Sequence, residues 1–112
     1  MVGVKYVYCT FQRGGVHQWN NASGKVEYLR NLHHHYFFFK VWVSVDSDDR
    51  EIEFILLRGE LESFVNTLGE KVGSCEMMIR EILNYLRDKY PHRKYKIDVS
   101  EEGINGAYYE GE

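Results

Sequence analysis

The chain has 112 residues, and we expect one domain that spans residues 1–112. It contains 44% hydrophobic residues and a single proline, a composition that argues against disorder and allows a hydrophobic core. Its formal net charge is −3, and its charged residues are interspersed rather than grouped in a basic block, which argues against nucleic-acid binding.

The first half of the sequence predicts two strands separated by an irregular segment. Residues 4–11 are rich in aromatic and β-branched residues, and the Gly14-Gly15 pair is expected to end this strand. Residues 17–31 are mostly polar and predict a loop or an irregular hairpin. Residues 36–45 predict the second strand, because hydrophobic residues share one face. These are Phe37, Phe39, Val41, Val43 and Val45.

The second half predicts a turn and two helices. Residues 46–49 are a predicted turn, followed by a brief extended stretch over residues 51–55. Hydrophobic residues then recur at helical spacing and predict a short helix over about residues 59–68. A second helix is expected to have Ser74 as its N-cap and to end before Pro91.

Two further strands are predicted near the end of the sequence. Residues 95–100 alternate between hydrophobic and polar side chains, residues 103–106 form a turn, and residues 107–109 begin the last strand. The order is therefore β-β-α-α-β-β. It predicts an α+β domain with a four-stranded antiparallel sheet and both helices on one face.

Three histidines predict a metal site. His33 and His35 are two residues apart, so on an extended strand they project from the same face. A third imidazole from His17 would complete a three-nitrogen site with an open fourth position, the ligand count of a catalytic zinc site. His34 belongs to the opposite face and is not expected to be a ligand. Zinc is the expected ion, although imidazole also suits iron, nickel and copper.

The order of motifs resembles that of a known enzyme family. His17 is followed by Leu32-His33-His34-His35, then by Gly-Ser-Cys-Glu at residues 73–76. Val-Ser-Glu at residues 99–101 and Ala-Tyr-Tyr at residues 107–109 complete the pattern. In these features the chain resembles a divergent member of the 6-pyruvoyl-tetrahydropterin synthase and 6-carboxy-tetrahydropterin synthase family.

This resemblance implies a fold, a cofactor and a substrate class. The fold is the tunnelling fold, in which the sheets of neighbouring subunits join into a β-barrel, and it implies a homo-oligomer, a trimer or a hexamer. Zinc would be bound by His17, His33 and His35, and Glu101 would hold a pterin or a purine-like ligand, with the adjacent Glu102 as the alternative anchor. The implied activity is that of a lyase acting on dihydroneopterin triphosphate or a related pterin.

Other features depart from the family pattern and leave catalysis open. The family's cysteine before the His-x-His motif corresponds to Leu29, and residues 68–72 contain neither the Asp nor the His of the family's Asp-His pair. The remaining candidates for a general base are Glu27, Glu70 and His92. The alternative is therefore a non-catalytic homologue that binds a metal and a pterin or purine.

The two cysteines, the apolar stretches and the composition of residues 1–5 bear on the expected location. Cys9 and Cys75 make no disulfide framework, and Cys75 is expected to be a small buried residue. A nucleophilic role for Cys75 would require a lowered pKa. The longest apolar stretch, residues 37–45, is too short for a membrane span and is interrupted by Lys40. With no signal-peptide layout, a cytoplasmic location without membrane contact is expected.

Overall fold

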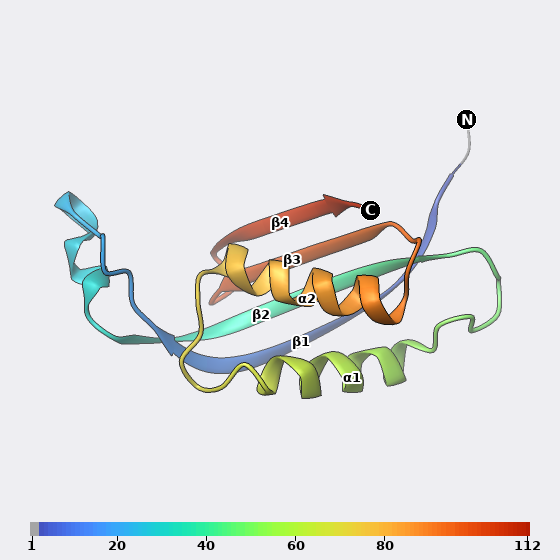
Figure 1. Cartoon of the computed structure of the whole chain (residues 1–112), viewed down its shortest axis with the longest axis horizontal. Coiled ribbons are helices and arrows are strands. Elements are labelled where there is room, and N and C mark those ends of the chain that lie inside the picture. The colour runs from blue at the N-terminus through green and yellow to red at the C-terminus, as the bar shows by residue number, and fades with distance from the viewer. Residues whose placement is uncertain (1–2) are drawn as a thin grey trace.

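The computed structural model describes residues 3–112 as a sheet covered on one side by two helices (Figure 1). The elements in chain order are β1 (Lys5–His17), the 3-10 helix η1 (Gly24–Arg30), β2 (His33–Val45), α1 (Phe54–Asn66), α2 (Cys75–Lys89), β3 (Tyr95–Glu101) and β4 (Asn105–Gly111). The strands form one antiparallel sheet in the order β1-β2-β3-β4. The predicted α+β class and the four-stranded antiparallel sheet are confirmed.

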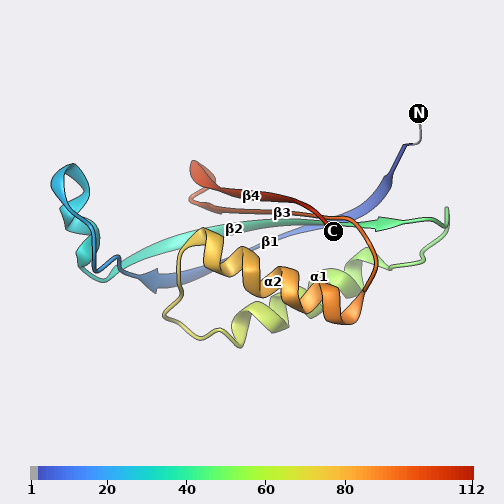
Figure 2. The same ribbon diagram turned by 45° about the horizontal axis from the view of Figure 1, so that its top comes forward.

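The hydrophobic core lies between the sheet and the two helices, while the other face of the sheet is left uncovered (Figure 2). The alternating residues of β2 face this core, as their spacing predicts, and Phe37, Val41 and Val43 have no exposed surface. Leu57 of α1 and Leu86 of α2 are equally inaccessible. Full burial of side chains of this size stabilises the fold by roughly 1.5–3 kcal/mol each.

The Gly14-Gly15 pair does not end the first strand, and β1 continues to His17. Gly15 lies in a crowded place: a Cβ atom there would lie 3.3 Å from the ring of Phe37 and 3.4 Å from the carbonyl oxygen of Glu70. The segment around Glu70 bonds directly to β1, since Val16 donates to Glu70 at 3.0 Å and accepts from the amide of Val72 at 2.8 Å. Glycine here marks close packing of two backbones.

The irregular segment after β1 contains η1, which projects beyond the end of the sheet (Figure 1). Arg30 ties this segment together, because its Nε donates to the carbonyl oxygen of Ala22 at 2.6 Å, and Ala22 has no exposed surface. β2 begins at His33, three residues before the predicted start. The histidines therefore lie within regular strand geometry.

The prediction of an extended stretch over residues 51–55 was wrong, because α1 begins at Phe54. Glu53 acts as the N-cap, and its carboxylate accepts from the amide of Leu56 at 2.8 Å. The predicted N-cap of α2 is confirmed: the hydroxyl of Ser74 accepts from the amide of Met77 at 3.1 Å. Neither helix is long and apolar enough to cross a membrane, and no other helix within residues 3–112 is.

Candidate metal centre

The three predicted ligands meet at one end of the β1–β2 hairpin. His17 pairs directly with His33 across the two strands, and His35 is the next residue of β2 on the same face. The ring centroids are 4.6 Å apart for His17 and His33, 5.1 Å for His17 and His35, and 4.9 Å for His33 and His35. One ligand nitrogen from each ring lies within 4.8 Å of the other two. We call this cluster the histidine triad.

The second ring nitrogen of each histidine is held by an oxygen atom. Nδ1 of His17 lies 3.1 Å from the carbonyl oxygen of Gly73, and Nδ1 of His33 lies 2.7 Å from that of Asn31. Nδ1 of His35 lies 2.7 Å from Oε1 of Glu102. These oxygens can only accept, so Nδ1 carries the proton in each ring and a neutral ring has its lone pair on Nε2. Metal-bound histidines typically have this arrangement.

The three oxygen acceptors lie in three different segments that connect helices and strands. Asn31 follows η1, and Gly73 precedes the N-cap of α2. Glu102 lies in the β3–β4 turn with a φ of +55°, which is unusual for a residue other than glycine. Its backbone amide donates to the carbonyl of Tyr36 at 2.8 Å, and its Oε2 accepts from the Tyr36 amide at 3.2 Å. The turn is thereby fixed against β2 beside His35.

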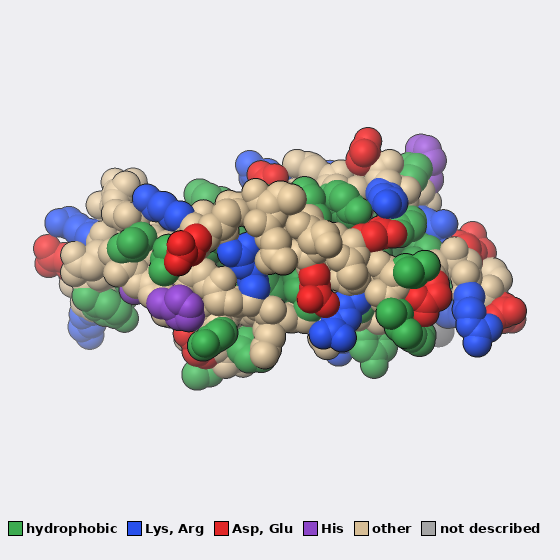
Figure 3. Space-filling model, turned by 90° about the horizontal axis from the view of Figure 1, so that it is seen from below, with side chains coloured by type: hydrophobic (Ala, Val, Ile, Leu, Met, Phe, Trp, Pro, Cys, Tyr) green, Lys and Arg blue, Asp and Glu red, His purple; other side chains and the backbone are tan. Residues whose placement is uncertain are grey.

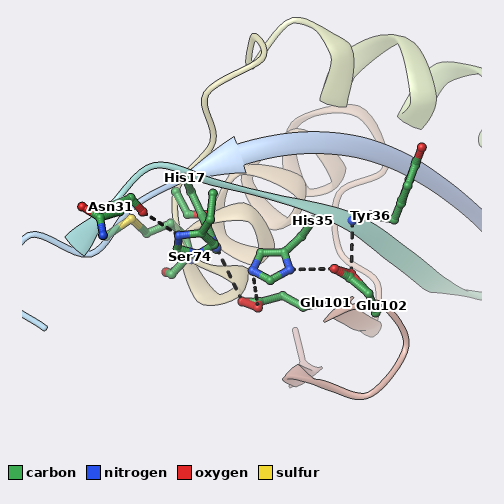
Figure 4. A network of polar contacts seen from close by, with 10 residues as sticks. His17, Asn31, His35, Tyr36, Ser74, Glu101 and Glu102 are labelled. Carbon is green, nitrogen blue, oxygen red and sulfur yellow. Dashed lines mark hydrogen bonds and ion pairs between the residues drawn. The ribbon is translucent and has the colours of Figure 1, made fainter. Parts of the chain in front are cut away.

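Glu101 lies directly beside the triad (Figure 4). It continues the buried face of β3 and pairs with Phe37, the residue that follows His35 on the same face of β2. Its Oε2 lies 3.1 Å from Nε2 of His35, and its Oε1 lies 3.7 Å from Nε2 of His17. The ring of His35 is therefore flanked by the two carboxylates of Glu101 and Glu102.

The residues of the triad fit a transition-metal ion. Nε2 of His35 is buried and has no hydrogen-bond partner among the described residues, so its lone pair is available. The side chain of His17 is only 12% exposed and its ring packs edge-on against Phe37, which limits its movement. In a tetrahedral zinc site the ligand nitrogens are about 3.3 Å apart. The ligand nitrogens of the triad lie within 4.8 Å of one another, so an ion would draw the rings closer together.

His34 lies on the opposite face of the sheet and is exposed, as predicted. Its ring packs edge-on against Tyr36, with centroids 5.1 Å apart. It also occupies space above Gly14, where a Cβ atom would lie 2.8 Å from Nε2 of His34. The absence of a side chain at Gly14 thus makes room for the one histidine of the run that is not in the triad.

None of the three candidate bases is bonded to the triad within residues 3–112, although the backbone carbonyl of Glu70 accepts from the amide of Val16, the residue before His17. Glu27 is exposed on η1 and pairs with Arg30 at 3.4 Å. Glu70 has an exposed side chain. His92 follows α2 at the opposite end of β2, close to the point where the carbonyl of Lys94 accepts from the amide of Ser44. No hydrogen bond or ion pair within residues 3–112 joins Glu27, Glu70 or His92 to the triad.

The cysteines are buried, as expected for Cys75. Burial, and then the negative charges of Glu101, Glu76 and Asp98, raise the pKa of Cys75 to about 11. Burial also raises the pKa of Cys9 to about 11. Both thiols are therefore protonated near neutral pH, which disfavours a nucleophilic role. By contrast, the hydrogen bond from His35 lowers the pKa of Glu102, which remains an acceptor.

Sequence reasoning found the three histidines and Glu101 but missed the groups that hold the rings. Two of these groups are the backbone carbonyls of Asn31 and Gly73. Every residue has a backbone carbonyl, so the sequence does not show which ones hold a ring. Glu102 was considered only as an alternative ligand anchor, whereas its carboxylate holds His35. Comparison of the chain with protein-family models and with curated proteins finds no match.

Proposed function

We propose that the chain is a zinc-dependent, pterin synthase-like protein of the cytoplasm that acts on dihydroneopterin triphosphate or a related pterin or purine. One observation carries the proposal: each of the three imidazoles is held through Nδ1 by an oxygen atom, and one nitrogen from each ring lies within 4.8 Å of the other two. Supporting features are the observed element order and the motif order that resembles the pterin synthase family.

The chemistry proposed for the site combines a metal with a carboxylate. Bound zinc would supply Lewis acidity that polarises oxygen atoms of a substrate side chain and eases proton removal from the adjacent carbon. His17, His33 and His35 would hold the ion. Glu101, beside them, offers two acceptor oxygens that suit the paired N–H donors of a pterin or purine edge.

A second candidate function is binding of a metal and a pterin or purine without catalysis. It is favoured by the candidate bases, since Glu27, Glu70 and His92 make no hydrogen bond or ion pair with the triad within the described residues. Leu29, at the place of the family's cysteine, cannot transfer a proton. The raised pKa of Cys75 argues against its use as a substitute.

We also propose that the active form is a closed homo-oligomer, a trimer or a hexamer. β1 and β4 are the edge strands of the sheet, and unpaired strand edges are usually covered or joined in natural proteins. Within residues 3–112, β4 has no strand partner other than β3, and β1 has only one isolated bridge, from Val16 to Lys71, on its outer side. A neighbouring subunit could add a base that the single chain does not place at the triad.

The proposal is tested by metal analysis followed by incubation with dihydroneopterin triphosphate. Purified wild type should contain about one transition-metal ion per chain, His35→Ala should contain much less, and His92→Ala should match wild type. Product chromatography then separates the two candidate functions: turnover supports the enzyme, and binding of a reduced pterin without turnover supports the binding protein. A wild-type protein that takes up no metal would reject both.

A further inference from the structure

The carboxylate of Glu101 lies on the side of the triad where ligand nitrogens are available. Its two oxygens contact Nε2 of two different histidines, at 3.1 Å for His35 and 3.7 Å for His17. The side chain of Glu101 is 32% exposed and that of His35 is 22% exposed, so solvent screens this contact only in part. The carboxylate is thus held against the triad rather than extended into solvent (Figure 4).

The contact between Glu101 and His35 brings together two acceptors. Because Glu102 fixes the proton of His35 on Nδ1, a neutral His35 presents a lone pair at Nε2. The ionised carboxylate of Glu101 also presents lone pairs. Two acceptors 3.1 Å apart repel each other unless a cation lies between them.

The contact between Glu101 and Nε2 of His35 has the distance of an ion pair but not the direction of a hydrogen bond. Nε2 of His35 has no hydrogen-bond partner among the described residues, although the oxygen of Glu101 is within range. The oxygen therefore lies near the nitrogen but away from the direction of an N–H bond.

The distances are those expected between two ligands of one metal ion. Nitrogen and oxygen ligands lie about 2.0–2.2 Å from zinc, so adjacent ligands of a tetrahedral site are about 3.3 Å apart. Oε2 of Glu101 lies 3.1 Å from Nε2 of His35, close to that value, while its other oxygen, Oε1, lies 3.7 Å from Nε2 of His17. A carboxylate oxygen is also a common zinc ligand beside histidine.

We infer that Glu101 is the fourth protein ligand of the metal held by His17, His33 and His35. The inference rests on the proposed metal site. It adds that, without substrate, the fourth coordination position of the metal is filled by Glu101 rather than left open. A pterin or purine edge with two parallel N–H donors can withdraw the carboxylate from the metal and open the fourth position. Glu101 then has both roles in turn, first as a metal ligand and later as the heterocycle anchor.

The test uses the full chain loaded with Co²⁺, whose visible absorption reports its ligands, and azide as a small probe anion. A site closed by Glu101 gives a wild-type spectrum that azide leaves unchanged, whereas azide shifts the spectrum of Glu101→Ala. Competition with a chelator measures the metal affinity, which should fall by about a hundredfold or more in Glu101→Ala. Loss of a residue that only hydrogen-bonds to a ligand typically lowers metal affinity by roughly 10- to 100-fold, so a larger fall indicates a direct ligand. Glu110→Gln, a carboxylate on β4 that pairs with Lys96, is the matched control and should behave as wild type.

The outcomes distinguish this inference from the proposed function. A wild-type spectrum that azide shifts as strongly as that of Glu101→Ala overturns the fourth ligand but leaves the three-histidine site standing. Absence of Co²⁺ binding in wild type removes the metal site and the inference together. If Glu101→Ala does not fold, as judged by circular dichroism, the azide response of wild type alone still decides.

Discussion

His17 and His33 face each other as directly paired residues of β1 and β2, with ring centroids 4.6 Å apart. Directly opposed residues of an antiparallel pair have Cβ atoms about 4.5–5.5 Å apart, which is close enough for both rings to reach one ion. The register of the long hairpin therefore sets the geometry of the site. A shift by one residue would move His33 and His35 to the uncovered face of the sheet.

The first prediction concerns His33, which pairs with His17 across β1 and β2. His33→Ala should lose most of the bound metal, because two imidazoles remain and the Asn31 carbonyl no longer holds a ring. His34→Ala is the matched control, since His34 is adjacent in sequence but lies on the other face. Elemental analysis of both purified variants checks this. Equal metal content in the two variants would contradict the triad.

The second prediction concerns the residue that holds His35. In Glu102→Gln the charged acceptor at Nδ1 is lost, so the ring is a weaker ligand and is oriented less firmly. The metal affinity should fall roughly 10- to 100-fold, as measured by chelator competition. Azide should still leave the Co²⁺ spectrum of this variant unchanged, because Glu101 remains in place. A spectrum that becomes sensitive to azide would instead assign Glu102 as a ligand.

Much of the fold could be predicted because the strands and α2 have clear local signals. The alternation through Phe37–Val45 and the N-cap Ser74 gave the correct face of β2 and the correct start of α2. The start of α1 was wrong because Phe54, Ile55 and Leu56 form a hydrophobic run that suits a strand. All three remain more than half exposed on the helix. On the side of the molecule seen in Figure 3, hydrophobic side chains reach the surface in several separate places.

The candidate site could be predicted only from the identity of its side chains and from which residues share a strand face. His33 and His35 share a face by spacing alone. The direct pairing of His17 with His33 depends on β1 continuing through Gly14-Gly15, which was predicted to end the strand. The end of β1 pairs with the start of β2 and bonds to the segment around Glu70, and neither tertiary contact has a local signal.

The third prediction concerns assembly. Joining of the β1 and β4 edges of neighbouring chains should give a particle of three or six times the 13.3 kDa mass of one chain. Light scattering at micromolar concentration measures this mass directly. A monomer under these conditions would refute the proposed barrel, although it would leave the metal site untouched.

The fourth prediction compares two glycines. A Cβ atom on Gly106 of β4 would overlap the carbonyl oxygen of Val99 and would lie only 2.7 Å from Cα of Ser100, so Gly106→Ala should destabilise the fold by about 1–3 kcal/mol. Gly59 lies inside α1 with no atom within 4 Å of an added Cβ. Gly59→Ala should therefore stabilise the fold by about 0.5–1 kcal/mol, because alanine favours the helix. Urea unfolding of the two variants measures both changes in the free energy of unfolding. Changes of the same sign in the two variants would contradict this account.

The last prediction concerns acid stability and involves Glu51, which lies far from the triad at the opposite end of the sheet. Its carboxylate accepts from the backbone amides of Ser47, at 2.9 Å, and of Asp46, at 3.1 Å, and it pairs with Arg93. The amide of Ser47 is the largest cause, followed by Arg93, and together these contacts lower the pKa of Glu51 from 4.5 to about 2.

A pKa that is lower in the folded state stabilises the protein at pH values above the unfolded pKa. The contribution of Glu51 should therefore be fully present above about pH 5 and should disappear as the pH falls from 4.5 towards 2. Glu51→Gln should lower the free energy of unfolding at pH 6 and reduce its decline between pH 5 and pH 2. Glu81→Gln, an exposed carboxylate on α2, is the control and should decline as wild type does. Urea unfolding at several pH values makes the comparison, and parallel curves for wild type and Glu51→Gln would show that Glu51 makes no such contribution.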